Sequence, residues 1–96
     1  MPISNDMIRA FLRNYVRGYE DYFDVGSILA KQLATEFLAA MDEVPPSRAR
    51  LVSLLYELES REWLPEFKGS GWTEMCICVR TFARNSGIDM PPRPDL

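Results

Sequence analysis

Histidine is absent from this chain of 96 residues, and its absence excludes several kinds of active site. Without an imidazole there is no Ser-His or Cys-His nucleophile pair, no histidine general base and no histidine metal ligand. Cysteine is scarce, with two residues, Cys76 and Cys78. Thiols at positions i and i+2 of a helix point to nearly opposite sides, so these two neither bridge well nor complete a zinc site. We expect no metal, no cofactor and two ordinary thiols in a reducing compartment.

Long hydrophobic runs are also absent. The apolar runs are a few residues long, whereas a helix that spans a bilayer needs about 20. The first residues, "MPISNDMIRAF", lack the basic region followed by an apolar stretch that marks a secretory signal. There is no glycine-rich phosphate loop and no activated nucleophile. We therefore expect a cytoplasmic protein that has no membrane partner and is not an enzyme.

An excess of positive charge is missing too. The chain carries 11 basic and 14 acidic residues, which gives a net charge of −3. A mildly acidic chain has no global electrostatic reason to bind nucleic acid, so we expect no direct nucleic-acid partner. The charges of both signs are intermixed, which suits the solvated faces of helices.

Helical periodicity is what the chain does have. Apolar residues recur at steps of three and four in segments near 5–23, 24–43, 48–64 and 70–85. Ser4 or Asn5 is suited to cap the first segment, with Gly18 or "FDVGS" as the place for a bend or break, and Ser47 is suited to cap the third. Val25 and Ile28 belong to the expected buried stripe of the second. No alternating run predicts a strand. The sequence predicts one all-α domain at residues 1–88, a compact antiparallel bundle of four to six helices. Residues 89–96 are expected to form a flexible, proline-rich tail or the start of a linker.

The stretch "SREWLPEFKGSGW" joins the third and fourth predicted helices. Trp63 and Trp72 extend apolar faces that aliphatic residues already define. We interpret the two rings as caps on the end of the core that fix this turn. Two alternatives remain: a ligand slot built from Trp63, Phe67 and Trp72, or one exposed ring that anchors a protein contact.

Charged residues gather in separate places. Arg9, Arg13 and Arg17 recur every four residues and form a basic ridge along the first helix. The ridge is either a solvated helix face or a docking surface for an acidic protein partner. Acidic residues gather after the first helix and on the third: Glu20, Asp21, Asp24, Glu57, Glu59, Glu62 and Glu66. Such a surface either pairs with copies of itself, giving a homo-oligomer, or is scattered surface charge.

Three stretches together resemble caspase-recruitment domains (CARDs) of the death-fold superfamily. They are "NDMIRAFLRNYVRGYEDYFDVGSILAKQL" at 5–33, with Val25, Ile28 and Leu29 at the step into the second helix; "LVSLLYELESREW"; and "GWTEMCICVRTFARNSG". The resemblance covers residues 5–88 and is greatest to the N-terminal CARDs of cytosolic RNA-sensing helicases and their adaptor. The region between the second and fourth family helices is short here, and "MPPRPDL" is unsuited to the sixth.

The resemblance implies a death-fold-like module for homotypic protein–protein interaction, with signalling in innate immunity or apoptosis and oligomerisation. It implies a basic patch on the first and fourth family helices, which transfers to Arg9, Arg13 and Arg17 with Arg48 or Arg50. Our other candidates for protein contact are Glu57, Glu62 and Trp63. The alternative function is a stand-alone small viral or phage protein that inhibits a defence complex by surface binding.

Overall fold

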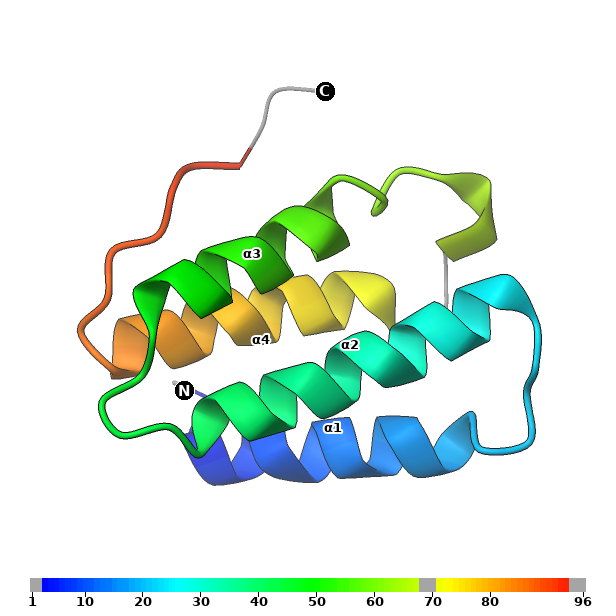
Figure 1. The fold of residues 1–96 in the computed structure, drawn as a ribbon, viewed down its shortest axis with the longest axis horizontal. Helices are drawn as coiled ribbons and strands as arrows, with labels where there is room; N and C mark the ends of the chain where they lie inside the picture. Colours follow the sequence, from blue (N-terminus) through cyan, green and yellow to red (C-terminus); the bar gives the residue numbers. More distant parts are fainter. Residues whose placement is uncertain (1–2, 68–70, 94–96) are drawn as a thin grey trace.

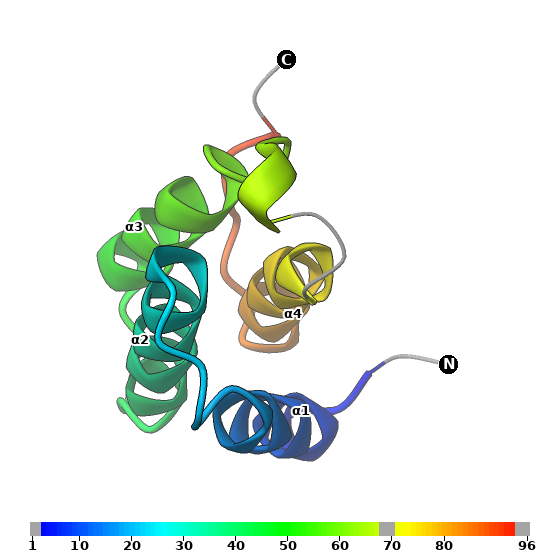
Figure 2. The same ribbon diagram turned by 90° about the vertical axis from the view of Figure 1, so that its right-hand side faces the viewer.

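The computed structural model describes residues 3–67 and 71–93, and within them it contains four α-helices. These are α1 (Asn5–Gly18), α2 (Val25–Met41), α3 (Arg48–Glu59) and α4 (Trp72–Asn85), with a short 3₁₀ turn, η1 (Pro65–Phe67), before α4. Consecutive helices run antiparallel (Figure 1). Viewed end-on, α1 and α3 occupy opposite corners of the bundle (Figure 2). The prediction of a compact, all-α antiparallel bundle is confirmed.

Three of the helices begin at side-chain caps. The side-chain oxygens of Ser4, Asp24 and Ser47 each accept a hydrogen bond of 3.1–3.2 Å from the amide three residues later. This geometry satisfies one of the amides that a helix start leaves without a partner. Hydrogen bonds from Ser27 lower the pKa of the Asp24 carboxyl, so this cap is charged at neutral pH. Ser4 and Ser47 therefore act as the sequence predicts.

The first helix ends at Gly18, one of the two places given for a bend or break in the predicted segment 5–23. Glycine is a poor helix former, and the chain turns directly after it. The turn is packed by aromatic rings: Tyr19 lies 4.9 Å from Tyr15 and 5.3 Å from Tyr22, centroid to centroid. A tilted and an edge-on ring contact thus hold the chain in the turn that leads to α2.

The third helix also ends early, at Glu59 instead of near Leu64. Two carbonyl groups that would continue the helix accept hydrogen bonds from side chains. The guanidinium of Arg61 donates to the carbonyl of Glu57 at 2.8 Å, and the indole N–H of Trp72 donates to that of Leu58 at 2.6 Å. These donors satisfy carbonyls of the last turn of α3, and residues 60–63 beyond it form turns.

The core lies where all four helices meet. Its largest fully buried side chains include Ile8, Leu12, Phe37, Leu51, Leu55, Leu58, Trp72, Met75 and Val79. On α2 the buried face runs through Ala30, Ala34 and Phe37. The prediction that Val25 and Ile28 are buried is wrong, because both lie on the other side of α2 and are exposed. Small alanines face the core because α2 packs against all three other helices.

After α4 the chain turns back along the bundle (Figure 1). We call residues 88–93 the C-terminal strap. The amide of Ile88 donates to the carbonyl of Ala83 at 2.8 Å, and Arg48 on α3 donates to the carbonyl of Asp89 at 2.8 Å. The first part of the predicted tail thus contacts the bundle; residues 94–96 lie outside the described residues. The flexibility of residues 89–96 stays a prediction.

Candidate protein-interaction surfaces

A groove with several basic side chains lies between α1 and α2. Its volume is about 450 Å³, and we call it the basic groove. It is lined by Arg13, Val16, Arg17, Glu20, Lys31, Thr35 and Leu38. Arg13 and Arg17 are exposed and make no ion pair with another described residue. Three cations and one carboxylate leave the lining with a net charge of +2 (3 − 1).

Lys31 belongs to this groove although the sequence did not single it out. Its ammonium donates to the carbonyl of Tyr22 at 2.9 Å and lies 5.3 Å from the ring centroid of Phe23. The loop between α1 and α2 therefore fixes the position of the ammonium. A cation held in this way loses less conformational entropy when it contacts a partner.

The other predicted basic residues are used within the chain. Arg9 donates to the carbonyl of Met41 at 3.2 Å, at the end of α2, and lies 3.7 Å from Asp42. Arg50 forms an ion pair with Glu43, and Arg48 holds the strap. Arg48 and Arg50 lie on α3, at the corner of the bundle opposite α1 (Figure 2). The structure therefore does not bring the five arginines into one patch.

Two of the predicted acidic residues, Glu57 and Glu62, are paired as well. Glu57 accepts a hydrogen bond of 2.7 Å from Arg61, which is the i, i+4 pair that the sequence predicts. Glu62 forms an ion pair with Arg93 of the strap. Both carboxylates are thus neutralised inside the chain, and neither offers an unpaired charge to a second copy.

Trp63 and Trp72 have opposite environments. Trp72 is 1% exposed and its ring packs against Phe67 at 4.3 Å, so it caps the core as interpreted. Trp63 is 54% exposed, so the same interpretation is wrong for this ring. The indole N–H of Trp72 finds its acceptor on Leu58, 14 residues earlier. Trp63 follows the end of α3 and lies on the surface instead.

Trp63 lines a second hollow, of about 430 Å³, between α3 and the C-terminal strap. We call it the α3 groove. Its lining is mostly apolar: Val52, Leu55, Tyr56, Glu59, Ser60, Trp63, Pro91 and Pro92. Tyr56 is 71% exposed and forms part of the same wall. Two exposed aromatic rings and two prolines therefore face one groove.

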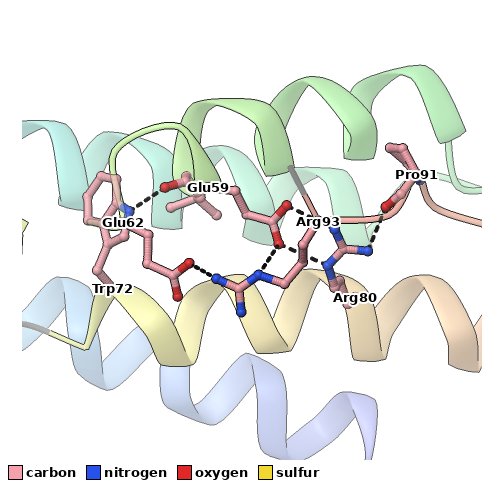
Figure 3. A network of polar contacts seen from close by, with 7 residues as sticks. Glu59, Glu62, Trp72, Arg80, Pro91 and Arg93 are labelled. Atoms are coloured by element: carbon pink, nitrogen blue, oxygen red, sulfur yellow. Dashed lines mark hydrogen bonds and ion pairs between the residues drawn. The ribbon is translucent and has the colours of Figure 1, made fainter. Parts of the chain in front are cut away.

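A row of alternating acidic and basic side chains connects α3, α4 and the C-terminal strap (Figure 3). Arg93 lies between Glu62 and Glu59, and Glu59 is in turn bound by Arg80 of α4. Arg80 also donates to the carbonyl of Pro91 at 2.7 Å. The carboxylate side chains of Glu59 and Glu62 are 5% and 9% exposed. This network has no signal in the sequence, since Glu59 and Arg80 are 21 residues apart and only the packing of α3 against α4 joins them.

Cys76 and Cys78 are both buried and free. Burial raises the pKa of the Cys76 thiol to about 12, and the carboxylates of Glu62 and Glu59 add to the effect. Burial, with Glu74 nearby, also raises the pKa of Cys78. Thiols that remain protonated are poor nucleophiles and poor metal ligands.

Residues 3–67 and 71–93 contain no group of three or more Cys, Asp or Glu side chains placed to hold a metal ion. Within the same ranges, no helix has both the length and the apolar character needed to cross a membrane. Comparisons of the chain with protein-family models, with curated proteins and with solved structures gave no match.

Proposed function

We propose that this chain is a non-enzymatic protein-binding module that docks an acidic segment of a partner protein in the basic groove. The observation that carries the proposal is the state of the arginines. Six of them, Arg9, Arg48, Arg50, Arg61, Arg80 and Arg93, bind carboxylates or carbonyls of the chain itself. Arg13, Arg17 and Arg84 have no such partner among the described residues. Arg13 and Arg17 together flank a groove of about 450 Å³, whereas Arg84 lies on α4 beside a smaller hollow.

The shape of the groove suits a peptide segment. Val16 and Leu38 supply an apolar floor, and the cations stand around it. A segment with acidic and apolar residues would bury its apolar side chains there and pair its carboxylates with the guanidinium groups. Arginine suits this task because its planar fork binds a carboxylate through two hydrogen bonds.

The CARD resemblance implies a special case, in which the acidic segment belongs to another copy or another death-fold domain. The pairing of Glu57 with Arg61 and of Glu62 with Arg93 disfavours those two residues as the acidic side of such a contact. We propose a heterotypic acidic partner, with signalling in innate immunity or apoptosis as the process that the resemblance implies. A second copy that offers its exposed Glu20, Asp21 or Glu66 is the competing outcome of the test.

The test is binding of a labelled peptide that alternates glutamate and leucine, followed by fluorescence anisotropy. We expect Arg13→Glu/Arg17→Glu to weaken binding at least about tenfold, since two favourable charge contacts become repulsive. Arg84→Glu is the matched control, because Arg84 is an exposed arginine of α4 outside the basic groove. It should change the affinity less than about twofold.

Binding should also weaken as salt is raised, since screening lengths fall to about 8 Å at 0.15 M. Equal affinity of the double variant and the wild type would contradict the proposal. Preference for a nucleic acid of equal charge would contradict it as well. Light scattering on the same samples would show whether a second copy competes for the groove.

A further inference from the structure

The α3 groove is lined by aromatic rings and prolines, and it is separate from the basic groove. The chain's own Pro91 and Pro92 lie against it, beside the exposed rings of Tyr56 and Trp63. Aromatic grooves bind proline-rich segments because such segments are already extended and lose little entropy on docking. The groove still has a volume of about 430 Å³ beside the strap.

The acidic side chains at the Glu59 side of the groove favour a cation bound beside them. Glu59 lines the groove and is linked to Glu62 through Arg93; with the strap in place both carboxylates are nearly buried, and α4 supplies one cation, Arg80. Without a second cation the cluster carries a net charge of −1 (1 − 2). Burial of an unpaired charge is costly, so a guanidinium next to Glu62 is strongly favoured. Arg93 now fills this position, with its Nε 3.8 Å from Glu59.

The backbone contacts fit the same kind of ligand. Arg80 binds the carbonyl of Pro91, and Arg48 binds that of Asp89. An extended proline-rich backbone makes no internal hydrogen bonds, so its carbonyls are available for such donors. None of these backbone contacts depends on the identity of the strap's side chains.

We propose that the α3 groove is a binding site for a proline-rich, arginine-bearing segment of another protein, and that the C-terminal strap occupies part of this site until the partner displaces it. The recognised element is a pair of prolines followed by arginine. The prolines lie against Tyr56 and Trp63, and the arginine pairs with Glu62 and Glu59.

The test uses the full chain and a fluorescein-labelled peptide, Ile-Asp-Met-Pro-Pro-Arg-amide. Arg93→Glu is the key variant, since the new carboxylate repels Glu59 and Glu62 and releases the strap, while Tyr56 and Trp63 of the groove are unchanged. We expect this variant to bind the peptide at least about tenfold more tightly than wild type. The reason is that the wild-type strap competes at a millimolar effective concentration.

Two further comparisons test the recognised chemistry. In the Arg93→Glu background, Trp63→Ala should weaken binding about tenfold or more, whereas Val44→Ala, a change at an exposed position in the loop between α2 and α3, should leave it unchanged. A peptide in which glutamate replaces arginine should lose binding. Circular dichroism checks that each variant is folded; if Arg93→Glu is not, Arg93→Ser is the second host.

The proposal is overturned if the freed groove binds the arginine and glutamate peptides equally. Equal affinity of the wild type and the Arg93→Glu chain would also overturn it, because the strap would then not occupy the site. A concentration-dependent wild-type dimer that the peptide dissociates would assign the groove to strap exchange between copies instead.

Discussion

Arg80 on α4 binds Glu59 on α3 through two parallel hydrogen bonds, from Nε to Oε2 and from Nη2 to Oε1, each 2.9 Å long. The Glu59 side chain is almost fully buried, so this pair joins the two helices inside the protein. Removing one partner of a buried pair leaves the other charge without compensation, and that is the costly event.

We therefore expect Arg80→Ala to lower the free energy of unfolding by about 3 kcal/mol. The estimate is at the lower end of the usual range because Arg93 remains 3.8 Å from Glu59. Urea denaturation measures the change. Arg84→Ala, also on α4 but exposed, should cost less than about 0.5 kcal/mol.

A double-mutant cycle sharpens this prediction. Arg80→Ala/Glu59→Ala should be less destabilised than the sum of the two single variants, since the second change removes the orphaned charge. Strict additivity would mean that the two residues do not stabilise one another.

Replacing a glycine by alanine should change the stability in opposite directions at two positions. Gly71 has φ of 79°, and a Cβ atom there would lie 2.7 Å from Cε2 of Tyr15. Gly71→Ala should therefore cost about 2 kcal/mol or more, from a left-handed conformation and a steric overlap. Gly18 lies in α1 with no atom within 4 Å of an added Cβ, so Gly18→Ala should stabilise by about 0.5 kcal/mol or more.

Gly87 separates the two causes, because its φ is 73° but nothing lies within 4 Å of an added Cβ. Gly87→Ala should cost about 1 kcal/mol from backbone strain alone. Thermal denaturation should rank the melting temperatures Gly18→Ala above wild type, then Gly87→Ala, then Gly71→Ala, with about 4–8 °C for each kcal/mol. Equal values for the Gly71 and Gly87 variants would show that Tyr15 does not restrict the turn.

The raised pKa of Cys76 predicts a loss of stability at high pH. The folded chain holds this thiol proton more tightly than the unfolded chain, in which the pKa has its ordinary value of 9.0. The stabilisation is therefore complete below about pH 9 and is lost as the pH rises towards the folded pKa of about 12.

Melting temperatures between pH 8 and 11 test this linkage. Wild type should lose stability more steeply than Cys76→Ala, which cannot ionise at this position. The difference in melting temperature between the two chains at pH 8 reflects the packing that the substitution changes. The test is therefore how steeply each melting temperature falls as the pH rises. Parallel slopes would contradict the prediction.

The different exposure of Trp63 and Trp72 predicts how the fluorescence of the protein responds to a quencher. Wild-type emission should contain a quenchable component from Trp63 and a protected one from Trp72. Trp63→Phe should leave emission at shorter wavelength that acrylamide quenches several-fold less, because water does not reach Trp72. If the remaining emission were as quenchable as that of free tryptophan, Trp72 would not lie in the core.

The sequence by itself determined the all-α class, four helical segments within a predicted range of four to six helices, and the starts of the first and third helices. The side chains of Ser4 and Ser47 cap their own helices by accepting hydrogen bonds from amides three residues later. Contacts between residues so close in the chain can be predicted from the sequence. The pair of Glu57 and Arg61 was predictable for the same reason, since one helical turn brings them together. The exposure of Arg13 and Arg17 also follows from periodicity.

Only the tertiary structure decided the rest. It buried Trp72 and exposed Trp63, although both extend apolar faces, because one indole N–H has a carbonyl acceptor on α3. It turned the alanines of α2 inward and left Val25 and Ile28 outside. Lys31 joined Arg13 and Arg17, and Arg80 joined Glu59, through contacts between residues far apart in the chain. Periodicity fixes which residues share a helix face, whereas the partner of that face depends on how the helices pack.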